Sequence, residues 1–148
     1  MEFQNLQSKE TEQALKDHEI QRFQDQYTVF GHFEPPHYFV FAEDKNRKLI
    51  MSENYVSKSQ LIEGDELILR KSGSQQYYKM VNPAPRTSLN CFVQKYKGDT
   101  FAVTGQRSWK IMQSTVIFHT LKQGDLVNII IPQAESEYCA FDSIVLSE

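Results

Sequence analysis

The sequence has few of the features that mark secreted, membrane-spanning or metal-binding proteins. Its 148 residues include two cysteines, Cys91 and Cys139, and neither has a CxxC partner, which argues against a disulfide scaffold or a zinc knuckle. No apolar run is long enough to span a bilayer. The N-terminus has no basic segment followed by an apolar one, so we expect no secretory signal. A reduced, cytoplasmic setting without contact to a membrane fits these absences.

Enzyme motifs are missing as well. The sequence contains neither GxSxG nor HExxH, and its four histidines stand at no metal-ligand spacing with Cys, Asp or Glu. The paired carboxylates Glu43-Asp44 and Asp65-Glu66 fall in turn-like segments, where acidic residues are favoured for structural reasons. We therefore expect no catalytic activity, no metal and no cofactor.

Charge is unevenly distributed along the chain. The net charge of −3 arises in residues 1–26, which hold six acids and three bases, whereas residues 27–148 hold thirteen of each. Residues 86–122 carry six bases and one acid, and residues 123–148 carry five acids without Lys or Arg. This segregation fits a basic groove on a neutral body, or a solvated surface of no particular function.

The residue pattern of the chain changes near Tyr27. Before it, residues 5–26 lack Gly and Pro and are rich in Gln, Glu and Lys, which predicts a helix with one narrow apolar stripe. After it, short runs of Val, Ile, Tyr and Phe alternate with the turn clusters EPPH, EDKNR, IEGD, KSGS, NPAP, KGD, TGQ and KQGD. Strand-like runs at this spacing predict an all-β sandwich or barrel.

The strand-like region contains an internal repeat. YFVF matches TFAV, and RKLIMS matches WKIMQS, both at an offset of 62 residues. Gly64-Asp65 then matches Gly124-Asp125 at an offset of 60, so a single two-residue gap aligns five segments. An ordered series of this length indicates duplication.

Each repeat reads as five strands with a Gly-Asp turn before the fourth. Five strands in about sixty residues is the size of a small closed barrel such as the OB-fold; an SH3-like barrel is the rival. The prediction is a mainly all-β chain: an N-terminal α-helix (1–26), two tandem five-stranded OB-like, cold-shock-like barrels (27–82 and 88–148), and a linker (83–87).

Tyr38-Phe39-Val40-Phe41 is apolar on both faces, because side chains alternate along a strand. One interpretation exposes Phe39 and Phe41 as a platform on which bases stack, each stack being worth roughly 1–3 kcal/mol. The other covers them with the N-terminal helix or with the neighbouring barrel.

Residues 29–81 carry three pieces of a known pattern: Phe39-Val40-Phe41, the segment ENYVSKSQL from Glu53 to Leu61, and Gly64-Asp65. In these pieces the chain resembles the RNA-binding, cold-shock-like domain of the bacterial transcription terminator Rho, in which a helical piece also precedes the barrel. The match covers roughly a third of the chain, and the middle segment is its most specific part.

The resemblance implies that Phe39, Phe41 and Tyr55 form an aromatic patch for single-stranded, pyrimidine-favouring RNA. Two positions depart from the family, since Val40 replaces a glycine and Glu43 stands where a basic residue would help to hold a phosphate. The GxxxxGK[ST] phosphate loop is absent, so the ATPase of that family is not expected.

The leading hypothesis is therefore a non-enzymatic protein that binds single-stranded RNA, or single-stranded DNA. Five basic residues of the first repeat would neutralise phosphates: Lys48, Lys58, Arg70, Lys71 and Lys79.

At the offset of 62, Phe41 and Tyr55 align with the aliphatic Val103 and Ile117, so the second barrel is expected to be the scaffold. Within that barrel, Trp109 beside Lys110 offers one further stacking or phosphate contact, although a lone Trp is more often core.

The alternative is a protein-interaction module. Tandem barrels behind a helix rich in Gln and Glu also resemble, more loosely, the coiled-coil-plus-OB front ends of proteasomal ATPases. In that case the aromatic residues would be buried against a protein partner, or in a homo-oligomer formed through the N-terminal helix or the second barrel.

Overall fold

The chain is built mainly from antiparallel β-strands. The computed structural model describes residues 26–147, so the predicted helix over residues 1–26 lies outside them, except for Gln26. The strands are β1 (Gln26–Glu34), β2 (Tyr38–Phe41), β3 (Lys48–Ile50), β4 (Glu66–Ser72), β5 (Gln75–Asn82), β6 (Arg86–Tyr96), β7 (Asp99–Thr104), β8 (Arg107–Lys110), β9 (Leu126–Pro132) and β10 (Ala140–Leu146). Two helices accompany them, α2 (Glu53–Ser59) and α3 (Gln113–His119).

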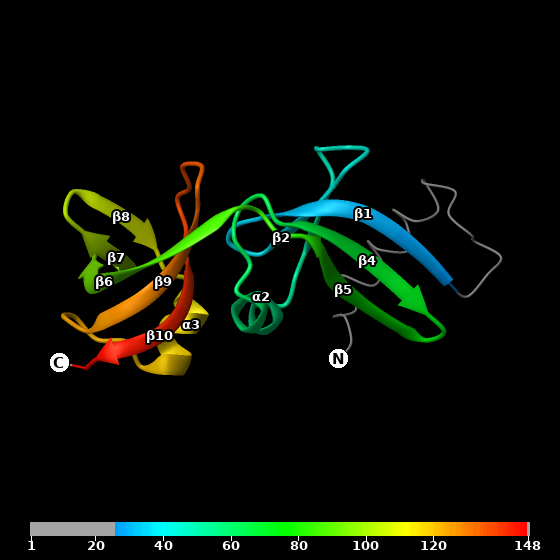
Figure 1. The fold of residues 1–148 in the computed structure, drawn as a ribbon. Coiled ribbons are helices and arrows are strands. Elements are labelled where there is room, and N and C mark those ends of the chain that lie inside the picture. The colour runs from blue at the N-terminus through cyan, green and yellow to red at the C-terminus, as the bar shows by residue number, and fades with distance from the viewer. Residues whose placement is uncertain (1–25, 148) are drawn as a thin grey trace. The chain divides into compact units, whose positions relative to one another are not determined.

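The strands form two five-stranded sheets with one shared layout (Figure 1). The first sheet has the order β3-β2-β1-β4-β5, and the second has the order β8-β7-β6-β9-β10 when it is read in the same direction. Every neighbouring pair in both sheets is antiparallel. The prediction of five strands in each repeat is confirmed.

The turns that precede the fourth strands are also as predicted. Gly64-Asp65 leads into β4 and Gly124-Asp125 leads into β9, with similar positive φ angles of 98° and 94° at the glycines. Both aspartates are fully buried. Their carbonyl oxygens accept hydrogen bonds from the first strand of each sheet, from Phe33 N–H at 2.8 Å and Val93 N–H at 2.9 Å.

The helices between the third and fourth strands were not predicted. Each is seven residues long, and the residue that follows each helix has a positive φ, 52° at Gln60 and 53° at Thr120. So short a segment shows no complete helical period, and the run Val-Ile-Phe in α3 is typical of a strand. Since α2 and α3 begin 60 residues apart, Tyr55 corresponds to Thr115 and not to Ile117.

Strand register corrects the alignment of the second strands. Phe39 lies opposite Leu49 in the first sheet, whereas Ala102 lies opposite Trp109 in the second. Phe39 therefore corresponds to Ala102 and not to Phe101. The offset is 63 residues here and 60 elsewhere, because the paired strands of the first hairpin extend further in the second repeat, while the loop after the second strand is shorter.

One face of each sheet forms a hydrophobic core. In the first sheet this face carries Val29, Phe33, Phe39, Phe41, Leu49, Leu67 and Leu69. In the second sheet the core includes Cys91, Val93, Ala102, Trp109, Val127, Ile129 and Ile131, with Val116 and Leu121 contributed by α3 and the residue that follows it.

Strand pairing leaves the sheets open, in contrast to the closed barrels predicted from sequence. In residues 26–147, no ladder joins the outermost strands of either sheet. The second sheet has one point of contact there: a parallel bridge between Lys110 and Tyr138. Lys110 N–H donates to the carbonyl of Glu137 at 2.8 Å, and Cys139 N–H donates to the carbonyl of Lys110 at 3.1 Å.

Contacts divide the described chain into two compact units. The first comprises residues 26–52 and 64–83, and the second comprises residues 53–63 and 84–147. Helix α2 thus belongs by its contacts to the second unit, where Gln60 Nε2 donates to Asp142 Oδ1 at 3.0 Å. Strand β6 begins at Arg86, so the last two residues of the segment expected as linker already pair with β9.

Candidate functional site

Phe39 and Phe41, which the resemblance made a stacking platform, lie in the core of the first unit. Both side chains are fully buried, and their ring centroids are 5.4 Å apart in an edge-to-face arrangement. The ring of Tyr78 packs 5.2 Å from that of Phe39. A base cannot stack on either phenylalanine while the unit is folded, so this part of the predicted site is corrected.

Tyr55, the third member of the predicted patch, belongs to α2 and not to a strand. Its side chain is half-buried, and this burial raises the pKa of the phenol, while a hydrogen bond with Ser59 lowers it in part. The three aromatic residues therefore do not form one exposed surface on the first sheet.

The basic residues predicted in the first repeat have different environments. Lys48 is held by Glu34, with 2.9 Å between Nζ and Oε2, and lies 5.0 Å from the centroid of the Tyr38 ring. Lys71 lies 5.7 Å from the centroid of the Tyr27 ring. Lys58 is exposed on α2.

Arg70 and Lys79, by contrast, are both exposed on the outer face of the first sheet. The fold thus brings these two predicted cations to one surface. Within residues 26–147, neither forms an ion pair with a carboxylate.

Trp109 is a core residue of the second unit. It lies opposite Ala102 and is almost fully buried, and the guanidinium of Arg107 covers its ring at 4.6 Å from the centroid. Of the two alternatives that the sequence left for Trp109, a stacking residue or a core residue, the structure shows the second.

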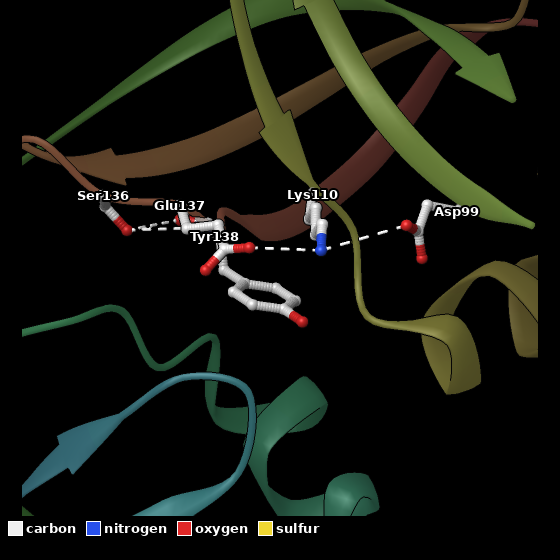
Figure 2. A network of polar contacts seen from close by, with 5 residues as sticks. All are labelled: Asp99, Lys110, Ser136, Glu137 and Tyr138. Atoms are coloured by element: carbon white, nitrogen blue, oxygen red, sulfur yellow. Dashed lines mark hydrogen bonds and ion pairs between the residues drawn. The ribbon is translucent and has the colours of Figure 1, made fainter. Parts of the chain in front are cut away.

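Lys110 lies at the surface of the second unit, between two carboxylates (Figure 2). Its Nζ is 3.1 Å from Glu137 Oε2 and 3.9 Å from Asp99 Oδ2, and it lies 5.9 Å from the centroid of the Tyr138 ring. The hydrogen bond to Glu137, with a smaller contribution from Asp99, raises the pKa of Lys110.

A shallow groove of about 360 Å³ lies on the outer face of β6, β7 and β8, next to Lys110. It is lined by Gln94, Tyr96, Phe101, Val103, Gly105, Gln106, Arg107 and Ser108. Strand alternation forms this face: Val93 and Ala102 point to the core, so their neighbours Gln94 and Phe101, which lie opposite each other, point outward.

The groove combines aromatic rings with positive charge. Tyr96 is 58% exposed and Phe101 is half-buried. Lys97 Nζ lies 5.3 Å from the centroid of the Tyr96 ring, and Lys110 lies opposite Phe101 across the strand pair. Arg107 is exposed and also lines the groove, while its guanidinium lies over the Trp109 ring. Rings that lie flat against bases and cations that contact phosphates are the two requirements of a single-strand surface.

Sequence reasoning missed Gln94 and Tyr96 and noted Phe101 only as the counterpart of Phe39. The signal for them is weak, because Val93-Gln94-Lys95-Tyr96 has no wholly apolar side and every residue of Phe101-Ala102-Val103 is apolar. The alignment at an offset of 62 hid it, because it placed Phe101 on the same face as the buried Phe39.

Neither cysteine is suited to reactivity. Cys91 is buried, and burial raises the pKa of its thiol to about 11, against the opposing effect of the Arg107 charge. Burial likewise raises the pKa of the Cys139 thiol. In the part of the chain that the structure describes, no three His, Cys, Asp or Glu side chains come together as a metal site. No helix within residues 26–147 combines the length and apolar character needed to cross a bilayer.

No protein-family model and no curated protein matches this chain. Its function is therefore inferred from the residues and geometry described above.

Proposed function

We propose that this chain is a non-enzymatic protein that binds single-stranded nucleic acid, with RNA as the expected form. The observation that carries the proposal is the groove on β6, β7 and β8, whose lining includes Tyr96, Phe101 and Arg107. Lys97 lies against the Tyr96 ring and Lys110 lies opposite Phe101, so we expect the two rings to stack on bases and the three cations to contact phosphates. Base stacking on such residues contributes roughly 1–3 kcal/mol per base and tolerates any sequence, since every base has an aromatic face.

The layout of the sheets supports an OB-like interpretation of both units. The first strand lies between the second and fourth, and a short helix lies between the third and fourth, which is an OB-type arrangement. The parallel bridge at Lys110 lies where the third strand would meet the fifth. OB-folds bind oligonucleotides on the face of strands 2 and 3, with the loops between strands 1 and 2 and strands 4 and 5.

The groove of the second unit lies on the equivalent face. Strands β7 and β8 are its second and third strands, Lys97 belongs to the loop between its first two strands, and Glu137 belongs to the loop between its last two. This agreement between a fold-level expectation and an independent feature of the surface favours the nucleic-acid proposal. The Rho-like character of the first repeat and a cytoplasmic setting remain parts of the same proposal.

A binding titration tests the proposal. Fluorescence anisotropy of a labelled oligouridylate should report saturable binding that a duplex competitor displaces poorly. The double variant Tyr96→Ala/Phe101→Ala should weaken this binding at least about tenfold, the loss expected from removing one base stack. Phe118→Ala removes a more exposed aromatic ring from α3, outside the groove, and should leave the affinity unchanged. Wild-type protein that does not bind, or a double variant that binds normally, would contradict the proposal.

Protein interaction is the second candidate, favoured by one observation on α3. Ile117 and Phe118 are 71% and 78% exposed, although large apolar side chains are costly to leave in water when they serve no purpose. If α3 mediates assembly, light scattering will give a mass above that of a monomer, and Ile117→Ser/Phe118→Ser will return it to the monomer value. A monomeric wild-type protein would exclude self-association through α3.

A further inference from the structure

The outer face of the first sheet carries a second group of exposed aromatic and basic side chains. Strands β1, β4 and β5 lie side by side there (Figure 1). Phe30, Ile68 and Lys79 form one row across the three strands, and Thr28, Arg70 and Tyr77 form the next. Phe30 is 62% exposed and Tyr77 is 42% exposed.

The hydrophobic core does not require these aromatic rings. Val29, the neighbour of Phe30 along β1, lies opposite Leu69 on the inner face and both are buried, so Phe30 points away from the core. Ile68, which lies opposite Phe30 on this outer face, is buried, but Phe30 itself stays largely in solvent. An exposed phenylalanine here is therefore better explained by a ligand than by folding.

Aromatic rings and cationic side chains alternate within this group. Arg70 lies directly opposite Tyr77, and residues that face each other in this way have Cβ atoms about 4.5–5.5 Å apart. Arg70 is also the diagonal neighbour of Phe30, at about 7–8 Å. Lys79 lies two residues beyond Tyr77 on the same strand face.

The charge of this face is positive. No carboxylate within residues 26–147 pairs with Arg70 or Lys79. The nearest acid in the ladder, Glu66, begins β4, and its Oε1 accepts a hydrogen bond from Asn82 Nδ2 at 3.1 Å. An anionic ligand with flat apolar groups complements such a face, and single-stranded nucleic acid has both properties.

The geometry points to a second contact surface for the same single strand, formed by Phe30, Arg70, Tyr77 and Lys79. This inference rests on the proposed function, with the groove of the second unit as the first surface. Each unit then contributes one surface, and a strand long enough to reach both binds more tightly than a short one, because the second contact becomes intramolecular.

The test compares two lengths of labelled oligouridylate, about 6 and about 24 nucleotides, since one OB-type surface covers roughly 4–16 nucleotides. The variant Phe30→Ala/Tyr77→Ala should reduce affinity for the long strand by about tenfold or more, as expected when avidity is lost. The number of short strands bound per protein should fall from two to one. Arg70→Gln/Lys79→Gln keeps both rings and should weaken the salt dependence of binding, which makes the test independent of any folding defect in the first variant.

The outcomes separate this inference from the proposed function. If Phe30→Ala/Tyr77→Ala and Arg70→Gln/Lys79→Gln bind the long strand as wild type does, while Tyr96→Ala/Phe101→Ala does not, the second surface is overturned and the groove stands. If no form of the protein binds either strand, both fail. If the wild-type protein is an oligomer that the Phe30/Tyr77 variant dissociates, the face serves protein contact and the inference is also overturned.

Discussion

Three residues of each unit fill the same place in the core with different side chains. Gly31, Phe39 and Leu49 occupy it in the first unit. A Cβ added to Gly31 would clash with the backbone carbonyl of Val40 and would lie 2.5 Å from Phe39 Cζ, so glycine is needed here. In the second unit Ala102 replaces the phenylalanine, and the freed space takes Trp109 and the side chain of Cys91. Such exchanges conserve volume, which protein cores tolerate best.

This packing predicts that Phe39 is a stability residue. Phe39→Ala should lower the free energy of unfolding by about 3–5 kcal/mol, because a fully buried ring is removed and leaves a cavity. Phe30→Ala, an exposed change one strand away, should stay within about 0.5 kcal/mol of wild type. Urea unfolding followed by circular dichroism measures both. A fully stable Phe39→Ala variant that has lost nucleic-acid binding would restore the stacking role that its burial excludes.

Glu137 competes with phosphate for Lys110. The ammonium is already engaged by Glu137 and Asp99 (Figure 2), so a phosphate has to displace a carboxylate to reach it. Glu137→Gln should therefore raise the affinity for single strands, by at most about fivefold, as expected for an exposed ion pair.

Glu135→Gln provides the matched control in the same loop. It changes the net charge equally but removes no contact to Lys110, so its effect on the titration should be smaller. Equal effects of the two substitutions would mean that only overall charge matters.

At the scale of elements, the sequence predicts the strands and turns well. Gly-Asp before the fourth strand and the Gly-containing hairpin turns set strand ends through local chemistry, and the structure confirms these ends. The turn Lys97-Gly98, with φ of 52° and 88°, connects β6 to β7 in two residues. Helices α2 and α3 are not predictable in this way, because seven residues are too few to show a helical period, and α3 also carries three consecutive β-branched residues.

The site was harder to predict than the fold for a physical reason. In Phe39-Val40-Phe41 every residue is apolar and buried, so periodicity does not reveal which side is core. The three-residue change in offset around the second strands then separates Phe101 from Phe39, so that Phe101 lies on the outer face while Phe39 is core. A strand shifted by an odd number of residues exchanges its two faces. Register, which decides exposure, is a tertiary property here.

The Gly-Asp turn supplies a prediction at this scale. Asp125 is fully buried, and its Oδ2 accepts a hydrogen bond from Lys122 N–H at 2.9 Å. Asp125→Ala leaves that donor unsatisfied and should lower the free energy of unfolding by about 1–3 kcal/mol. Asp99→Ala removes an exposed carboxylate from the β6–β7 end and should change stability little. Thermal unfolding distinguishes them, and equal melting temperatures would contradict a structural role for the turn.

At the scale of the whole molecule, net charge is a poor guide to the ligand. The chain carries −3 overall, but its excess acid lies in residues 1–26, and the segment 86–122 holds six bases against one acid. That segment contains Arg107, which lines the groove, and also Lys97 and Lys110. Local charge governs contact with phosphates, whereas net charge governs long-range attraction, which salt screens within roughly 10 Å.

Raising the salt concentration should therefore weaken binding, to an extent set by the number of phosphate contacts. Each phosphate contact on a single strand contributes a slope of about −0.7 to log K against log salt, so three groove contacts give about −2. Arg107→Gln should reduce the magnitude of this slope by about 0.7. Anisotropy titrations across a range of KCl concentrations measure it. A slope near zero would mean that phosphates do not contact the groove.

The most direct test of the central claim is a map of the ligand on the protein. In ¹⁵N-labelled protein titrated with oligouridylate, the amide resonances that move most should be those of the groove, Gln94, Tyr96, Phe101 and Ser108. The amides of Ile117 and Phe118 on α3 should stay in place. Shifts concentrated on α3, or no shifts at a saturating concentration of the oligonucleotide, would contradict a nucleic-acid interface on the face of β6, β7 and β8.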